Sequence, residues 1–386
     1  MKNIHIQFSV VLAVCSVCFG DTFTHYQTGE LLHGYATTKI VNNKSVVNTT
    51  DGEKYLSLAE YNIEFNHLGR NDTVAIIPII GEIESANQAE DFQEALLKEA
   101  NKGHKAIIVE IDTPGGRVDY AMQICNAFSG VNCPVVVYIC GGEYGGAFSA
   151  GAAISMACDK IYMSSNTVIG AATMIAVDGE GHISDMESAW GETVAEKMRS
   201  AWRSKLAAMA EQKNRPGMLA KAMEDKDIEV IEVKRNGEKM FISPVNKKLR
   251  DMEVKVWSEK GQLLTLTATD AVYCGMANKI VESREELLRD LDVADCGIVT
   301  NSAFDQATRD FQRANDKILK LASSIDVQIK KLSLIETRIQ AARALDSLEK
   351  DFKQLKLIKR KYPDVELDEM EIQLYLNDIK ALKSTL

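Results

Sequence analysis

Two apolar runs, each followed by a cluster of glycines, constrain the fold of this chain more than any other feature. Residues 106–112 (AIIVEID) precede Pro114, Gly115 and Gly116, and residues 135–140 (VVVYIC) precede four glycines within six residues. Continuous apolar runs rich in β-branched residues are typical of parallel strands that are buried on both faces. Because neighbouring parallel strands end at the same edge of a sheet, we expect the two glycine segments to lie together there.

The surrounding sequence alternates strand patterns with helix patterns. This order predicts right-handed crossovers and a stacked parallel sheet, which is an α/β fold. A run of short β-prone segments between residues 230 and 257 predicts a small antiparallel excursion. The helices predicted from apolar spacing cover residues 89–101, 118–128, 149–158, 185–213 and 268–274.

A serine stands where the second glycine segment passes into a helix. Ser149, in residues 148–151 (FSAG), opens a stretch of very small residues. At a helix N-terminus a hydroxyl lies near free backbone N–H groups and the positive end of the helix dipole. These are the parts of an activated nucleophile with an oxyanion hole beside it. A serine that only caps a buried helix fits the same local pattern and is the commoner case.

The order of these motifs resembles the serine peptidases of the Clp-protease/crotonase superfamily. The resemblance is carried by residues 111–116 (IDTPGG), by the FSAG segment and by residues 264–278, and it is loose between 179 and 260. It is most similar to the NfeD-type, membrane-associated proteases of the ClpP class, which are related to signal peptide peptidase A. The resemblance implies a ClpP/crotonase-like stacked parallel sheet of repeated ββα units, followed here by an all-α C-terminal appendage. It also implies an acyl-enzyme on Ser149.

The same resemblance implies the oxyanion donors, which are the backbone N–H groups of Gly116 and Ala150, with Gly115 as a further donor. Clp-type proteases use a histidine as general base, but Ala172 stands near the matching position. The NfeD-type enzymes use a lysine, which can act as a base when burial lowers its pKa.

The base is therefore predicted to be a lysine of helix 185–213. The family's lysine aligns near Ala207, and the nearest lysine is Lys205, beside Leu206. We predict Lys205 as the base, with Lys197 and His182 as the alternatives. We expect no metal and no cofactor, because the histidines and cysteines lack metal-binding spacing.

The first twenty residues have the pattern of a secretory signal peptide. Lys2 provides a short basic region, residues 6–17 are largely apolar, and small residues precede Asp21. Acylation at Cys15, which would tether the chain to a membrane, is the alternative. The signal predicts an exported, periplasmic or otherwise extracytoplasmic protein, with membrane association left open. In an oxidising compartment, a bridge between Cys125 and Cys133 is allowed.

The rest of the chain divides into three parts by composition. Residues 21–71 are polar and suggest an irregular leader with a strand or two, residues 72–292 hold the protease-like domain, and residues 300–386 are charged and helical. The apolar stripe of the last part is of coiled-coil type and is broken at Pro363. Two helices that fold back on each other explain this stripe as well as assembly into a homo-oligomer does.

Composition and motifs leave three functions to weigh. A net charge of −10 without a concentrated basic face excludes a nucleic-acid binder. The first hypothesis is an exported serine endopeptidase that cleaves peptide or membrane-protein segments, for which the resemblance suggests stomatin-like proteins. The second is a catalytically inactive scaffold that binds peptides along the sheet edge near residues 114–117. The third, a crotonase-like acyl-CoA enzyme, conflicts with the export signal.

Overall fold

The computed structural model describes residues 20–49, 51–64, 70–131, 133–177, 183–184, 186–332, 334–335 and 337–385. The chain divides into two compact units, Met1–Asn71 and Asp72–Leu386. Most of the predicted signal peptide, residues 1–19, lies outside the described residues. Within the described residues, no helix combines the length and the apolarity needed to cross a bilayer.

The first unit is a folded antiparallel sheet, so the prediction of an irregular polar leader over residues 21–71 is wrong. Its core is small and consists mainly of Phe23, Ala36 and Val47. A sheet with one buried face needs few apolar residues, which is why its composition resembles that of a loop. In sheet order the strands are β4 (Gly52–Leu56), β3 (Lys44–Thr49), β2 (Leu31–Val41), β1 (Asp21–His25) and β5 (Tyr61–Glu64), and η1 (Leu58–Glu60) precedes β5.

The second unit is built on the predicted parallel sheet. The apolar runs pair in register, with Val109 opposite Val137, and nearly every side chain in them is buried. The fold class expected from the sequence is therefore confirmed. In sheet order the strands are β18 (Lys279–Ile280), β10 (Lys160–Met163), β8 (Val135–Ile139), β7 (His104–Asp112), β6 (Asn71–Ile80) and β19 (Gly297–Thr300).

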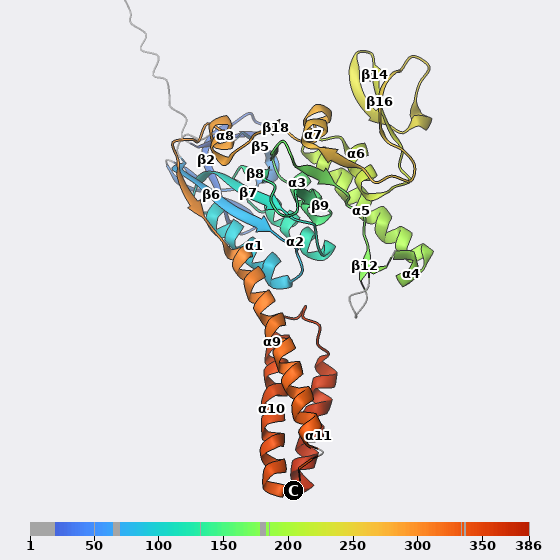
Figure 1. The fold of residues 1–386 in the computed structure, drawn as a ribbon. Coiled ribbons are helices and arrows are strands. Elements are labelled where there is room, and N and C mark those ends of the chain that lie inside the picture. The colour runs from blue at the N-terminus through green and yellow to red at the C-terminus, as the bar shows by residue number, and fades with distance from the viewer. Residues whose placement is uncertain are drawn as a thin grey trace, which may run out of the picture. The chain divides into compact units, whose positions relative to one another are not determined.

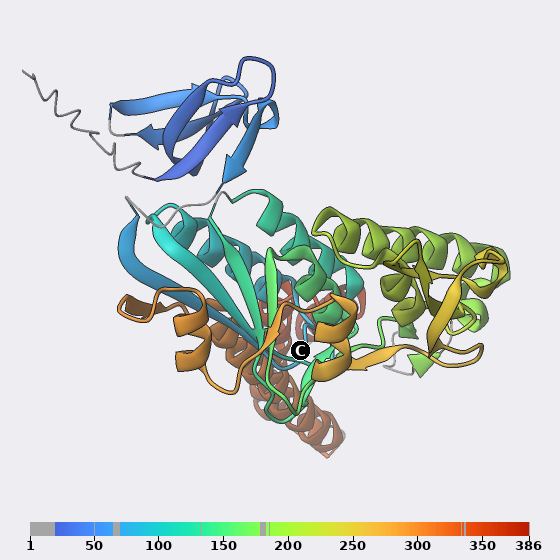
Figure 2. The same cartoon turned by 90° about the horizontal axis from the view of Figure 1, so that it is seen from above.

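Helices cover both faces of this sheet (Figure 2). Helices α1 (Ala86–Ala100), α2 (Val118–Ser129), α3 (Ala150–Ala157) and α5 (Glu192–Gln212) pack side by side on one face. Leu287 and Leu288 of α8 (Arg284–Asp290) pack on the other face. A smaller sheet stacks beside α3, with β9 (Gly146–Phe148) parallel to β11 (Val168–Gly170) and β17 (Thr265–Thr267) antiparallel to it.

The helical region that follows β11 in the chain departs from the prediction at one point. Gly191, at φ 78°, separates α4 (Met186–Trp190) from α5, so the single helix predicted over 185–213 is two helices. The predicted antiparallel excursion is present. Its strands and the neighbouring elements are β14 (Val230–Arg235), β15 (Glu238–Ile242), β16 (Met252–Ser258), β12 (Ala176–Val177), β13 (Ile183–Ser184), α6 (Gly217–Glu224), α7 (Ala268–Cys274) and η2 (Pro244–Asn246).

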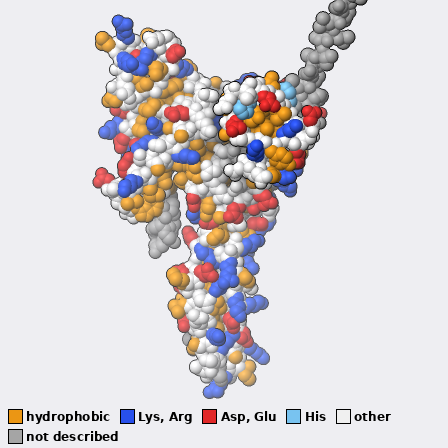
Figure 3. Space-filling view, turned by 180° about the vertical axis from the view of Figure 1, so that it is seen from behind, with side chains coloured by type: hydrophobic (Ala, Val, Ile, Leu, Met, Phe, Trp, Pro, Cys, Tyr) orange, Lys and Arg blue, Asp and Glu red, His pale blue; other side chains and the backbone are white. Residues whose placement is uncertain are grey.

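The C-terminal region is a bundle of three helices, α9 (Ala303–Leu332), α10 (Arg338–Lys361) and α11 (Glu369–Thr385), called the helical appendage below (Figure 1). Part of the predicted apolar stripe is used within the chain, because Ile325 packs against Leu348 and Phe352, whereas Ile329 and Ile339 of the same stripe are exposed. Charged side chains of both signs cover its outside (Figure 3). Helix α9 packs on α1, which joins the appendage to the sheet unit.

Among the described residues, no disulfide joins Cys125 and Cys133, so the bridge that an oxidising compartment would allow is not formed.

A buried arginine satisfies the C-terminal end of α3. The Arg215 guanidinium is 5% exposed and donates from Nη1 to the carbonyl oxygens of Met156 (3.1 Å) and Cys158 (2.9 Å). Nη2 reaches the Asp159 carbonyl at 3.2 Å, and Nε reaches that of Met276 at 3.1 Å. Carbonyls at a helix C-terminus lack intrahelical partners and carry partial negative charge, which a cation stabilises.

Replacing this arginine should therefore destabilise the second unit. Arg215→Met leaves four carbonyls without their donor, and each buried unsatisfied group costs about 1–3 kcal/mol, so we expect the free energy of unfolding to fall by roughly 3 kcal/mol or more. Urea denaturation followed by tryptophan fluorescence measures this, because all three tryptophans lie in the second unit. The control Arg313→Met, at an exposed site on α9, should cost less than about 0.5 kcal/mol. Equal effects of the two substitutions would contradict this account.

Candidate functional site

The two glycine segments meet at one edge of the sheet, as predicted. The Thr113 amide donates to the Gly146 carbonyl at 2.9 Å, and the Phe148 amide donates to the Thr113 carbonyl at 3.1 Å. Thr113 therefore lies beside Ala147 in a parallel bridge. Strand β9 ends directly before Ser149. The hydrogen bonds between Thr113 and β9 therefore hold the turn after β7 next to the serine.

The turn touches the serine through a position that only glycine can occupy. Gly115 has φ +118°, and a Cβ atom placed there would lie 2.6 Å from the Ser149 Cβ and 3.2 Å from its Oγ. At Gly116, with φ +148°, a Cβ atom would collide with the carbonyl of Ile83. These glycines therefore permit a close backbone approach, in addition to the positive φ values that other residues avoid.

Ser149 itself is held in an unusual conformation. Its φ of 51° and ψ of −113° lie outside the common regions for a residue with a side chain, and such backbones concentrate at functional sites. Its amide donates to the Gly170 carbonyl at 3.0 Å, and its carbonyl accepts from Ala152 at 3.1 Å. Although Ser149 is the N-cap residue of α3, its hydroxyl accepts no capping hydrogen bond. The half-buried Oγ is therefore not used as a cap.

Two of the three predicted oxyanion donors, which are backbone amides, donate no hydrogen bond within the described residues. The Gly115 amide donates to the Thr113 hydroxyl at 3.0 Å and is thereby used within the turn. In the part of the chain that the structure describes, the amides of Gly116 and Ala150 have no acceptor. The structure thus places Gly115 against the serine, while Gly116 and Ala150 supply the free N–H groups.

Asp112 shapes the glycine loop, and sequence reasoning missed it. Its carboxylate, 1% exposed at the end of β7, accepts from the Gly146 amide at 3.0 Å through Oδ1 and from the Tyr144 amide at 3.1 Å through Oδ2. A Cβ atom at Gly142 would come within 2.5 Å of the same carboxylate. An acidic residue that ends an otherwise apolar strand was the available signal, because a buried carboxylate requires hydrogen-bond partners.

Among the described residues, neither lysine of α5 forms a hydrogen bond with Ser149. Lys205 is exposed and, among the described residues, forms neither a hydrogen bond nor an ion pair. It lies near α2, where burial raises the pKa of the Cys125 thiol and the Lys205 ammonium opposes that rise. Lys197 is also exposed and lines an open hollow at the start of α5. His182, the remaining alternative, lies outside the described residues.

The position that matches the Clp-type histidine holds no acid or base. Ala172 is buried, its amide donates to the Met223 carbonyl at 2.6 Å, and its carbonyl accepts from the Trp202 indole at 2.9 Å. Hydrogen bonds to α5 and α6 therefore fix this segment. Among the described residues, no group of three or more His, Cys, Asp or Glu side chains is arranged to hold a metal ion.

A buried carboxyl next to this segment was not predicted. The Glu224 side chain is fully buried, its oxygens accept no hydrogen bond from the described residues, and Arg203 Nη1 lies 3.6 Å from Oε2. Burial raises the pKa of the Glu224 carboxyl to about 7, although the Arg203 guanidinium acts to lower it. No local pattern indicated this group, because its burial comes from the packing of α5 against α6.

Residues 73–249 match a family model described as the N-terminal domain of NfeD1b. This segment is called the NfeD-type domain below, after this similarity. Over 230 residues the chain is 28% identical to membrane protein NfeD1b of Bacillus subtilis (strain 168). That alignment covers 59% of this chain and 43% of the relative, so the chain spans less than half of the relative's length.

The solved structures similar to this chain include proteases. One is a mutant of 1510-N, a membrane-bound stomatin-specific protease, with 20% identity, coverage of 61% of this chain and 99% of that chain, and a TM-score of 0.45. Another is ClpP1 from Listeria monocytogenes, with 19% identity, coverage of 55% of this chain and 94% of that chain, and a TM-score of 0.33.

The buried Glu224 of the NfeD-type domain should make stability depend on pH. Its folded-state pKa lies above the ordinary value of 4.5, so the stability present below pH 4.5 is lost as pH rises toward about 7. In Glu224→Gln this loss is absent, and Arg203 retains Asp225 and Glu196 as partners. At pH 8 we expect the variant to be more stable than wild type by about 2 kcal/mol.

Urea unfolding at intervals from pH 4.5 to pH 8 measures the difference. The matched control is Glu229→Gln, an exposed residue before β14, whose profile should follow that of wild type. Parallel profiles for wild type and Glu224→Gln would show that the carboxyl titrates normally.

Proposed function

We propose that the NfeD-type domain is a serine peptidase with Ser149 as its nucleophile. The observation that carries this proposal is the Ser149 hydroxyl. It stands uncapped at the start of α3, on a strained backbone, against the Cα of Gly115. Strain of this kind costs about 1–3 kcal/mol and is retained where the surrounding structure enforces it.

In the proposed reaction, Oγ of Ser149 attacks the carbonyl carbon of the scissile peptide bond and gives up its proton to a base. The N–H groups of Gly116 and Ala150 donate to the oxygen that becomes negatively charged. Collapse of the tetrahedral intermediate breaks the C–N bond, and the departing amine takes the proton. Water then attacks the acyl ester, which releases the acid and restores the hydroxyl.

We propose Lys205 as the base, with Lys197 as the alternative on the same helix. Helix α5 packs on α3, the helix that begins at Ser149, and Lys205 is flanked by the buried residue Leu206. A lysine acts as a base only when it is desolvated. Because Lys205 is exposed and forms no hydrogen bond with Ser149 among the described residues, this role requires that substrate or a second copy of the chain both cover α5 and bring the ammonium within reach of the serine. A homo-oligomer is therefore part of the proposal.

The proposed substrate is an extended peptide or a segment of a membrane protein. One structural relative is named as stomatin-specific and membrane-bound, and the curated relative is named as a membrane protein. We propose stomatin-like segments as the first to test, in an exported protein that works at a membrane surface.

A second function, peptide binding without cleavage, is favoured by the position of Lys205. Its ammonium is exposed, and Ala172 stands where a histidine would serve. In that case peptides would bind along the edge beside residues 114–117 and would remain intact.

A fluorophosphonate probe, which reacts with activated serines, separates these functions. We expect wild type to be labelled, Ser149→Ala to lose labelling completely and Lys205→Ala to lose it by at least about a hundredfold, since general-base catalysis contributes 10²–10⁴. Lys197→Ala is the matched control on the same helix. Labelling that survives in Lys205→Ala but not in Lys197→Ala would move the base to Lys197. An unlabelled wild type that still binds peptide would establish the scaffold function.

The contact between Gly115 and the serine predicts a second effect. In Gly115→Ala, the new methyl group must displace Ser149, and a displacement of about 1 Å can cost a hundredfold in rate. We therefore expect labelling to fall by about two orders of magnitude. Gly237→Ala is the control, because Gly237 also has positive φ but has open space around it, in the β14–β15 hairpin. Equal labelling of the two variants would show that the contact does not matter.

A further inference from the structure

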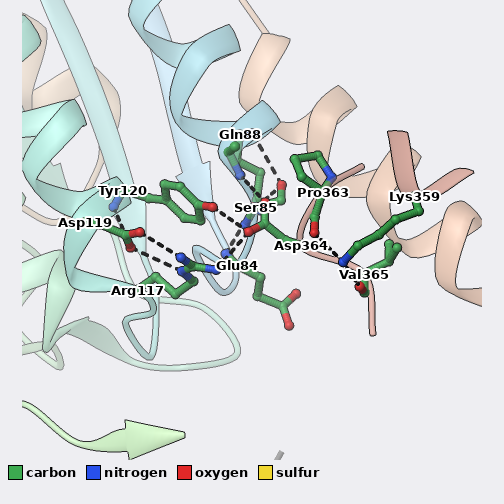
Figure 4. Close-up of polar contacts among 11 residues, drawn as sticks. Glu84, Ser85, Gln88, Arg117, Asp119, Tyr120, Lys359, Pro363, Asp364 and Val365 are labelled. Atoms are coloured by element: carbon green, nitrogen blue, oxygen red, sulfur yellow. Dashed lines mark hydrogen bonds and ion pairs between the residues drawn. The ribbon is translucent and has the colours of Figure 1, made fainter. Parts of the chain in front are cut away.

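One carboxylate of the helical appendage reaches back to the turn beside Ser149. Asp364 lies in the loop between α10 and α11, and its side chain is 8% exposed. Its Oδ1 accepts from Arg117 Nη1 at 2.8 Å and from the Tyr120 hydroxyl. Its Oδ2 accepts from the Ala86 amide at 2.8 Å (Figure 4). Three donors from two segments of the NfeD-type domain therefore converge on one carboxylate.

These two segments build the turn of residues 113–117, which is called the oxyanion turn below because it holds the proposed donor Gly116. The Ile83 amide donates to the Gly115 carbonyl at 2.9 Å, and the Arg117 amide donates to the Ile83 carbonyl at 2.9 Å. Gly116 lies between these two hydrogen bonds, opposite Ile83. Ala86 begins α1 three residues later, and Arg117 directly follows Gly116. Asp364, which belongs to the appendage, thus links the two segments that fix the Gly116 amide.

The electrostatics favour a carboxylate at this place. The N-terminus of the 15-residue helix α1 carries partial positive charge, and Arg117 adds a full one. Arg117 also pairs with Asp119 at 2.7 Å and lies 4.4 Å over the Tyr120 ring, so its guanidinium is already oriented. Hydrogen bonds between ionised groups are stronger than neutral ones. The carboxylate therefore bridges donors that are preorganised to receive it.

The loop that presents Asp364 is itself held in shape. Lys359 Nζ donates to the carbonyls of Pro363 at 2.7 Å and Val365 at 2.9 Å, on either side of the aspartate (Figure 4). The side chains of Tyr362 and Val365 are buried in the core of the appendage. The position of the carboxylate is therefore set by the packing of the three appendage helices.

We propose that Asp364 is a positioning residue of the catalytic site, through which the helical appendage fixes the oxyanion turn. This inference rests on the proposed peptidase function. A turn with two consecutive glycines at positive φ has much conformational freedom when free. Oxyanion donors act only when they are held in place before the reaction, so a turn of this kind needs an external restraint. Asp364 supplies it at both ends of the Ile83–Gly116 pairing.

The test compares Asp364→Asn with Asp346→Asn in the full chain. Both remove one negative charge from the appendage, but Asp346 is exposed on α10, and among the described residues its ion pair is with Lys383. Two quantities are measured, which are the amide hydrogen exchange of peptides covering 81–88 and 113–120 and the kcat and KM for cleavage of a peptide substrate. In Asp364→Asn we expect exchange at 113–117 to be about tenfold faster and kcat to be about tenfold lower with KM unchanged. Asp346→Asn should match wild type.

The outcomes separate this inference from the proposed function. Unchanged exchange and unchanged kcat in Asp364→Asn would overturn the inference, as would a rise in KM alone or faster exchange with normal kcat. If wild type neither cleaves peptides nor reacts with the fluorophosphonate probe, the proposed function fails. Exchange then decides alone whether Asp364 fixes the turn. Should Asp364→Asn not fold, Tyr120→Phe removes one of the three hydrogen bonds and must show the same changes at smaller size.

Discussion

The site depends on a backbone approach that only glycine allows. The Cα of Gly115 touches the Ser149 side chain, and this contact is possible because β7 and β8 are parallel neighbours whose following turns meet. Hydrogen bonds between Thr113 and the residues around β9 then fix the distance between the turn and the serine. The buried Asp112 carboxylate adds hydrogen bonds to the loop that leads to Ser149. The chemistry proposed for Ser149 thus depends on the turns that follow β7 and β8 meeting at one edge of the sheet.

The parts of this arrangement that depend on local pattern could be predicted from the sequence. Residues 106–112 and 135–140 are apolar and β-branched, so they indicated buried parallel strands, and the glycines after them indicated a close approach. The sheet of residues 21–64 was missed because a sheet with one small buried face contains many polar residues. The break at Gly191 was missed because the apolar spacing continues across it. Lys205 was chosen for its neighbours in the sequence, but the helix turns its ammonium to the surface.

Other features are invisible to any local reading because they arise from distant packing. Glu224 is buried by the contact of α6 with α5, and its raised pKa follows from that burial. The amphipathic spacing of the C-terminal region indicated helices but not their partners, and it left open whether they fold back or assemble copies. In the structure the stripe is covered within the chain only in part, and α9 joins it to α1. Asp364 stood beside a helix-breaking proline and looked like an ordinary turn residue.

The distance along the chain between Asp364 and its partners has a consequence for synthesis. Arg117 and Asp364 are separated by 247 positions, and the ribosome makes the oxyanion turn long before it makes the carboxylate that restrains it. Since domains fold from the N-terminus as they emerge, a nascent chain holds Ser149 and both glycine turns in a folded sheet while the restraint is still missing. Under the proposed function, a chain at this stage of translation would have lower activity than the finished protein, because it lacks the carboxylate that holds the turn. A chain cut between α9 and α10 would likewise keep every residue of the proposed site without this restraint.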